Sequence, residues 1–176
     1  MSARTRRRTR RGDAGASAVE FALVAPVLFL ILFGIVDYGI WFADSISARQ
    51  AVRDGARRGV VETFGTCAGA TGGDLGTLAC TTRGAMEPIS GTTYLKVTVA
   101  LAPGGAGGQT WAVGRTLRVC AMTQHTALMP LVPFPSDGIS RTKVEMPIEH
   151  AAGTVIVTRP AFREDPPSGG DWSWCP

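Results

Sequence analysis

The chain has 176 residues, 45% of them hydrophobic, and a formal net charge of +4. This apolar content excludes a fully disordered chain. Six arginines lie within residues 1–11, which leaves 12 basic against 14 acidic side chains in the rest of the chain. A slightly acidic body does not suit a groove that neutralises phosphates, so we predict no nucleic-acid partner.

A basic leader, residues 1–15, precedes a long apolar segment. The run from Phe21 to Phe42 contains a single charged residue, Asp37. As a helix, these 22 residues extend about 33 Å at 1.5 Å per residue, close to the hydrocarbon thickness of a bilayer. The sequence therefore predicts one membrane span over about residues 21–42, surrounded by membrane lipid.

The arginines also predict the orientation of this span. They precede it, and the next arginine is Arg49, so the positive-inside rule places the N-terminus in the cytoplasm and the C-terminus outside. The expected location is the cytoplasmic membrane, crossed once. We interpret Asp37 as a carboxylate at the outer headgroups, because at mid-bilayer it would cost about 2.5–3.5 kcal/mol.

The helical pattern continues beyond the span, which predicts one long helix over residues 16–62. One face carries small residues three or four positions apart: Ala48, Val52, Gly55, Ala56 and Gly59. The opposite flank carries three arginines at i, i+4 and i+8: Arg49, Arg53 and Arg57. In one interpretation the small residues pack on the chain's own domain and the arginines are solvated. In the other, the arginines contact a partner protein.

Residues 63–176 are expected to form a small domain outside the membrane. Residues 64–91 read as an irregular loop, and residues 92–101 alternate as a strand does. A second strand is expected over 110–122, forming an antiparallel hairpin with the first, and further strands over 143–148 and 153–158. The predicted fold class is α+β: a long N-terminal transmembrane and amphipathic helix, then a small antiparallel sheet of three or four strands with long loops.

The junction between leader and span carries the most informative motif. Gly15-Ala16-Ser17-Ala18-Val19-Glu20 resembles the type IV prepilin signal, in which a membrane peptidase cuts after a glycine and Glu is the fifth mature residue. Further runs extend the likeness: Val19-Glu-Phe-Ala-Leu-Val-Ala-Pro26, Gly34-Ile-Val-Asp-Tyr-Gly39 and Ala48-Arg-Gln-Ala-Val-Arg-Asp-Gly-Ala-Arg57. Over residues 15–58 the chain resembles the TadE-like family, minor pseudopilins of the tight-adherence (Flp) type IV pilus.

This resemblance implies a role in pilus assembly. Prepilin peptidase would cleave after Gly15, leaving Ala16 as the mature N-terminus, and the other implied partners are pilin and pseudopilin subunits and the assembly machinery. In the family, the residue corresponding to Glu20 pairs with the N-terminal amine of a neighbouring subunit; alternatively, Glu20 is an unpartnered interfacial carboxylate. Phe21 belongs to the assembly helix. Pro26 either softens that helix for extraction from the bilayer or is a simple kink.

Four cysteines suggest an oxidising destination with disulfides: Cys67, Cys80, Cys120 and Cys175. Three pairings are open. The local option joins Cys67 to Cys80 and closes a 14-residue loop, worth about 3 kcal/mol in the loop-entropy model. There is no C-x-x-C pair and no histidine close to a cysteine, so we expect no metal site.

No catalytic constellation is evident. His125 and His150 stand in no nucleophile or metal motif, and Glu145 and Glu149 lack a predictable partner carboxylate. We therefore expect no enzyme, no cofactor and no small-molecule substrate. The main alternative to a pilus subunit is an uncleaved, membrane-tethered binding module outside any filament; an anchored secreted hydrolase is the third. Sixteen arginines against two lysines favour a GC-rich bacterial genome.

Overall fold

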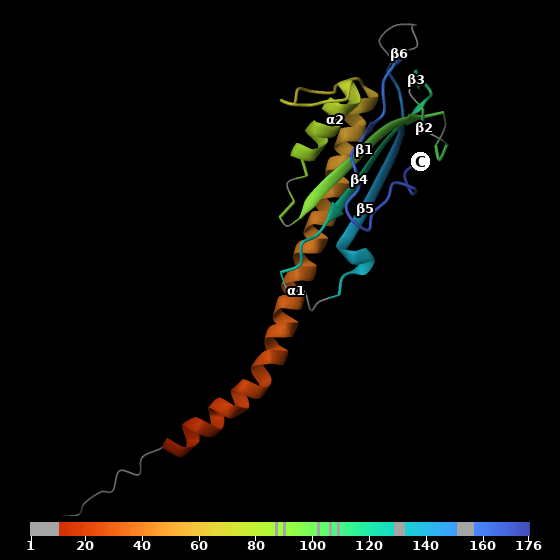
Figure 1. Cartoon of the computed structure of the whole chain (residues 1–176). Coiled ribbons are helices and arrows are strands. Elements are labelled where there is room, and N and C mark those ends of the chain that lie inside the picture. The colour runs from red at the N-terminus through yellow and green to blue at the C-terminus, as the bar shows by residue number, and fades with distance from the viewer. Residues whose placement is uncertain are drawn as a thin grey trace, which may run out of the picture.

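The structure is a computed structural model of the chain (Figure 1). It describes residues 11–86, 88–89, 91–101, 103–105, 107–108, 110–128, 133–150 and 157–176. The elements in chain order are α1 (Arg11–Val60), α2 (Gly73–Gly84), β1 (Thr92–Ala100), β2 (Gly107–Gly108), β3 (Thr110–Trp111), β4 (Thr116–Gln124), the 3-10 helix η1 (Pro135–Gly138), β5 (Ile139–Pro147), β6 (Val157–Thr158) and β7 (Phe162–Arg163).

Helix α1 is the long axis of the molecule and has two unlike halves. Its N-terminal half projects away from the domain, whereas its C-terminal half lies along the sheet (Figure 1). Pro26 lies inside the helix without ending it. The projecting half, drawn in red and orange, bends away from the line of the C-terminal half. A proline removes one helical hydrogen bond and is a common cause of such bends.

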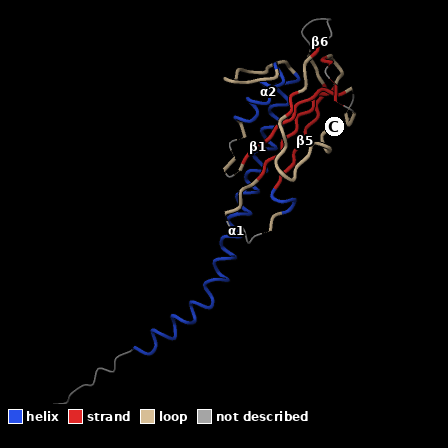
Figure 2. The backbone as a smooth tube through the Cα atoms, viewed as in Figure 1, coloured by secondary structure: helices blue, strands red, loops and turns tan. Residues whose placement is uncertain are grey.

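The sheet is antiparallel, with strand order β2-β1-β4-β5, and β7 also pairs with β1. Its central register pairs Val97 with Val119, and Val119 with Val144. A separate two-stranded ladder joins β3 to β6. Figure 2 shows the strands together on one side of the two helices. The predicted α+β class, with a long apolar helix, an antiparallel hairpin and a small sheet, is confirmed.

The core lies between the C-terminal half of α1, α2 and the inner face of the sheet. Alternation along β1 buries Leu95, Val97 and Val99 on that face. The small-residue face of α1 packs there too, and Val52 and Ala56 are fully buried. The interpretation that this stripe packs on the chain's own domain is thus confirmed.

The prediction of an irregular loop over residues 64–91 is wrong, because α2 occupies its centre. Three glycines in or at the ends of α2 hide it from propensity rules, since glycine costs about 1 kcal/mol relative to alanine in a helix. Burial compensates: Leu75, Leu78 and Ala79 are completely buried in the core. Tertiary packing on α1 and β1, rather than local preference, therefore stabilises this helix.

The second predicted strand, 110–122, is interrupted. Trp111 ends β3, and the chain turns before β4 begins at Thr116. Gly114 adopts a φ of 84° in this turn, and Val113 is exposed. The third strand begins earlier than predicted, at Ile139. Of the fourth predicted strand, residues 153–156 lie outside the described residues, and Val157–Thr158 form β6.

Candidate functional site

The exposed N-terminal half of α1 is the most unusual surface of the molecule. Large apolar side chains from Val19 to Val36 point into solvent on all sides of the helix; Leu23, for example, is 73% exposed. Among the described residues, one helix is long and apolar enough to cross a membrane, with a mean hydropathy of 2.6 in its best window. A contiguous apolar surface of this size indicates a lipid or protein environment.

The residues expected at the processing site lie at the start of this surface. Gly15, Ala16, Glu20 and Phe21 are all exposed. A Cβ atom added at Gly15 would meet nothing within 4 Å, so the fold itself does not require glycine there. Within the described part of the chain, no ion pair involves Glu20. Among the contacts of the described residues, neither Gly15 nor Glu20 supports the domain.

The domain holds α1 near the outer end of the predicted span, at Asp37 and Tyr38. The Asp37 side chain is fully buried, and its Oδ1 accepts a hydrogen bond of 3.0 Å from the backbone N–H of Leu128. His125 Nε2 lies 3.9 Å from the same oxygen. The Tyr38 hydroxyl donates to the carbonyl oxygen of Pro133 at 2.7 Å. Asp37 thus holds a domain loop, a role that the sequence interpretation did not include, and its position at the outer headgroups stays a prediction.

Helix α1 also holds a second loop by hydrogen bonds, one to three turns farther along. Asp44 Oδ1 accepts from the backbone N–H of Ile89 at 2.7 Å, and the Ser47 hydroxyl donates to the carbonyl oxygen of Met86. We call the four α1 residues that hold these two loops the junction: Asp37, Tyr38, Asp44 and Ser47. The junction fixes the domain to the helix at one defined height.

The three arginines named from the sequence are all exposed, but they do not act alike. Arg49 and Arg53 line a depression of about 300 Å³ together with Arg141 and Lys143 of β5. Arg57 does not line it. The sequence could not show Arg141 beside Arg49, because β5 is brought to α1 only by the sheet.

All four cysteines are paired. Cys67 joins Cys80 with their Cα atoms 6.0 Å apart, and Cys120 joins Cys175 with a Cα separation of 6.5 Å. The local option among the three open pairings is the one the structure shows. The first disulfide anchors the loop before α2, and the second ties the C-terminal tail to β4.

A buried arginine organises that tail. Arg118 is fully buried, and its guanidinium donates to Glu145 Oε1 at 2.7 Å, to the carbonyl oxygen of Gly105 at 2.8 Å and to the terminal residue Pro176. Burial alone would raise the pKa of Glu145, but the hydrogen bonds from Arg118 and from the Gly104 N–H hold it below its ordinary value. A buried charge requires this kind of pairing.

Lys96, on β1, also contacts the tail. Its ammonium group donates to the carbonyl oxygen of Cys175. Burial lowers the pKa of Lys96, and the nearby charges of Arg163 and Arg118 lower it further. Lys96 and Arg118 therefore both hold the C-terminal tail against the sheet.

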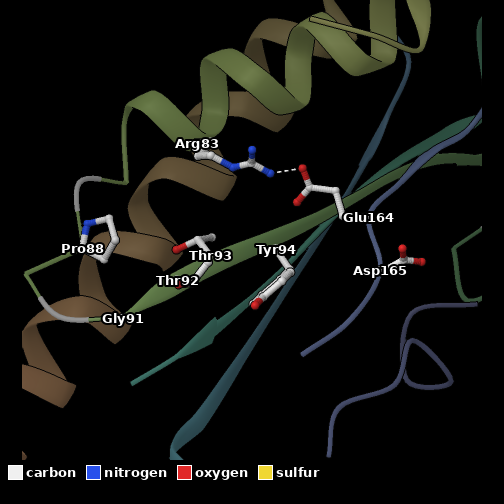
Figure 3. Close-up of a pocket in the computed structure, with 8 residues that line it drawn as sticks. All are labelled: Arg83, Pro88, Gly91, Thr92, Thr93, Tyr94, Glu164 and Asp165. Atoms are coloured by element: carbon white, nitrogen blue, oxygen red, sulfur yellow. Dashed lines mark hydrogen bonds and ion pairs between the residues drawn. The ribbon is translucent and has the colours of Figure 1, made fainter. Parts of the chain in front are cut away.

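A depression of about 480 Å³ lies between α2, β1 and the segment after β7 (Figure 3). Its two principal charged side chains, Arg83 and Glu164, form an ion pair with each other. Glu164 Oε2 also accepts from the backbone N–H of Leu95 at 2.8 Å. These groups link α2 to the sheet. Tyr94 and Asp165 are among the other residues that line the depression, and they do not form a nucleophile and base pair.

The histidines do not assemble a reaction centre. His125 is buried beside Asp37 and Phe134, and His150 lies 3.6 Å from Glu62 Oε2 at the surface. Among the described residues, no group of three or more His, Cys, Asp or Glu side chains is placed to hold a metal ion. Glu145 serves Arg118, as described above.

Comparison with known families concerns the N-terminal part of the chain. Residues 15–57 match the family model described as TadE-like protein. The match begins at the proposed processing glycine, covers the apolar half of α1 and the junction, and ends before α2 and the sheet. It confirms the TadE-like resemblance of this segment and supports a protein associated with the tight-adherence pilus. No curated protein and no solved structure matches the chain.

Proposed function

We propose that this chain, TadE-like over residues 15–57, is a minor pilin-like (pseudopilin) subunit for assembly of a tight-adherence pilus. One observation carries the proposal: a single continuous helix is held by its own domain over one half and exposes an apolar surface over the other. Such a surface suits the bilayer before assembly and the apolar interior of a filament afterwards. The role is assembly, without bond chemistry of its own.

Processing by prepilin peptidase after Gly15 is part of this proposal. The exposed position of Gly15 supports it, because the fold gives no reason of its own for a glycine there. Cleavage removes the arginines of the leader and creates an amine at Ala16. Glu20 lies four residues later, one helical turn away, where the helix dipole also favours a carboxylate. In the filament, we propose that Glu20 pairs with the amine of a neighbouring subunit.

The proposed topology has the N-terminus in the cytoplasm and the domain outside. The arginine asymmetry around the span supports it, and so do two disulfides in the domain, since disulfides persist in oxidising compartments. A topology reporter fused to the C-terminus should be active outside the cytoplasm. Activity of a cytoplasmic reporter at that position would contradict the proposal.

The processing step is tested by intact mass. The full chain is produced in cells with and without a prepilin peptidase, as native sequence and as Gly15→Leu. We expect loss of residues 1–15 only in the native chain and only with the peptidase. Gly12→Leu is the matched control, since it changes another leader glycine three residues away and should still be cleaved.

Recovery of the uncleaved 18.5 kDa chain from cells with active peptidase would overturn the processing proposal. It would favour the alternative, an uncleaved membrane-tethered binding module outside any filament.

A further inference from the structure

Two adjoining depressions run along the seam between α1 and the start of β5, and they share Arg49 and Arg141. The one nearer the apolar half of α1 has a volume of about 250 Å³ and is lined on the helix side by Trp41, Phe42 and Ile46. The other is the cationic depression described above, to which Arg53 and Lys143 also contribute. The seam is therefore apolar at one end and cationic at the other.

The cationic end is only partly compensated: four basic side chains meet there, and the exposed carboxylate of Asp171 interacts electrostatically with Arg141. Among the described residues, no ion pair involves Arg49, Arg53 or Arg141. Lys143 lies 3.4 Å from Glu145, whose carboxylate is already bonded to Arg118. Guanidinium groups present planar, paired donors that match a phosphate, so Arg49 and Arg141 form a suitable clamp for one.

The apolar end contains an unused donor. The indole N–H of Trp41 is buried and has no hydrogen-bond partner in the described part of the chain. Buried polar groups are nearly always bonded, and one without a partner calls for an explanation. Trp41 also lines the depression, but its N–H is covered, so a ligand seated there would reach this donor only after the indole shifts.

The place of the seam on α1 favours a lipid as the ligand. Exposed apolar side chains continue on α1 past Asp37, at Phe42 and Ile46, and Arg49 follows Ile46 by about one helical turn. An anionic headgroup at Arg49 would thus lie one turn beyond an apolar surface, and an arginine can bend its charged end toward such a group along its apolar stem. Figure 1 shows η1 and the start of β5 at the end of the domain that faces the projecting half of α1.

We propose that this seam binds one anionic phospholipid, with the phosphate between Arg49 and Arg141 and an acyl chain along Trp41, Phe42 and Ile46. An acidic side chain of another protein would satisfy the arginines but would leave the apolar end and its continuity with the span unexplained. The inference rests on α1 spanning a membrane and on neither cleavage after Gly15 nor incorporation into a filament, so it fails or stands separately from them.

The test uses the full-length chain in phosphatidylcholine nanodiscs that contain a minor fraction of lipid with brominated acyl chains, which quench tryptophan fluorescence on contact. Brominated phosphatidylglycerol should quench more than brominated phosphatidylcholine at the same fraction. Replacing both clamp residues, as Arg49→Gln with Arg141→Gln, should lower the apparent affinity for the anionic lipid about tenfold, the scale expected for a lost charge-assisted hydrogen bond.

A double variant of equal charge, Arg57→Gln with Arg163→Gln, is the matched control. Both residues are exposed and lie outside the seam, so this variant should keep the preference for phosphatidylglycerol. Both double variants should have the same unfolding temperature as the unmodified chain, because the four arginines are exposed.

Four outcomes would overturn the proposal. Equal quenching by the two brominated lipids would show that no anionic lipid is selected. Equal loss in both double variants would indicate general attraction to a charged surface. Full displacement of the lipid by soluble glycerol phosphate would show that the apolar end takes no part. If lipid selection is absent and the Arg49→Gln, Arg141→Gln variant loses a cross-link to another pilus protein, the seam binds a protein partner instead.

Discussion

The two halves of α1 show how one helix can be built for two environments. In the C-terminal half, alanines, glycines and Val52 face the sheet and α2, and polar residues face solvent. In the N-terminal half, apolar residues surround the helix and nothing in the described part of the domain covers the large ones. The C-terminal half is covered by the chain's own domain, whereas the apolar surface of the N-terminal half is left for partners outside the chain. Substitutions made in each half separately therefore test this difference.

The largest contrast is expected between leucines in the two regions. Leu117 is fully buried in the core, facing the C-terminal half of α1, whereas Leu30 is 50% exposed on the projecting half. Leu117→Ala should lower the free energy of unfolding by about 3 kcal/mol, as for other large-to-small core substitutions. Leu30→Ala should change it by less than about 0.5 kcal/mol. Chemical denaturation of the detergent-solubilised full-length chain measures both, and equal losses would contradict the division.

Asp37 marks the border between the halves. Asp37→Ala removes a buried carboxylate that accepts a part-buried hydrogen bond from the Leu128 N–H, so we expect a loss of about 2 kcal/mol in the free energy of unfolding, the scale of a hydrogen bond to a charged group. Asp54→Ala is the control: its ion pair with Arg58 is half exposed and should contribute less than about 0.5 kcal/mol. If thermal unfolding ranks the two variants equally, the junction does not hold the domain.

The glycines of α1 give a finer comparison. A Cβ at Gly55 would lie 2.3 Å from Thr82 Oγ1, and Thr82 is β-branched and bonded to the carbonyl oxygen of Leu78 at 2.7 Å. A Cβ at Gly34 would meet nothing within 4 Å. We expect Gly55→Ala to destabilise the domain by about 1 kcal/mol net of the gain in helix propensity. Gly34→Ala should leave the unfolding temperature of the domain unchanged.

The smallest effect concerns acid. Because the pKa of Glu145 is lower in the folded chain than its ordinary 4.5, its contribution to stability is present above about that pH and is lost as the pH falls through the folded value. The domain should therefore melt at lower temperature in acid, while the helicity of the projecting half stays constant. Glu145→Gln should flatten this acid dependence. An unchanged pH profile in that variant would assign the effect to other groups.

The local features of this fold were predictable because they depend on periodicity. Alternation at Leu95, Val97 and Val99 predicted β1, and the small-residue spacing around Val52 predicted that α1 continues past the membrane. Helix α2 was missed because its glycines disfavour a helix, and only contacts with α1 and β1 stabilise it. Residue spacing along the chain carries no record of such contacts.

The site was predictable only in part, for the same reason. Glu20 and Gly15 lie within one motif, so their spacing could be compared with a known signal. The Asp37 acceptor and the Leu128 donor are 91 residues apart, and no sequence pattern near either residue predicts their contact. Arg141 joins Arg49 only because the sheet places β5 beside α1. The sequence indicated surfaces that lie on a single helix or strand, and it missed surfaces that two elements form together.

The central claim, that the projecting half of α1 is a packing surface for other subunits, is tested most directly by photocross-linking in cells that make pili. A benzophenone amino acid placed at Leu30 should form adducts with other pilus subunits, and the same group at exposed Gln50 on the domain-bound half should not form those adducts. Failure of the Leu30 probe to reach any pilus subunit, in cells that still assemble fibres containing this chain, would contradict the account.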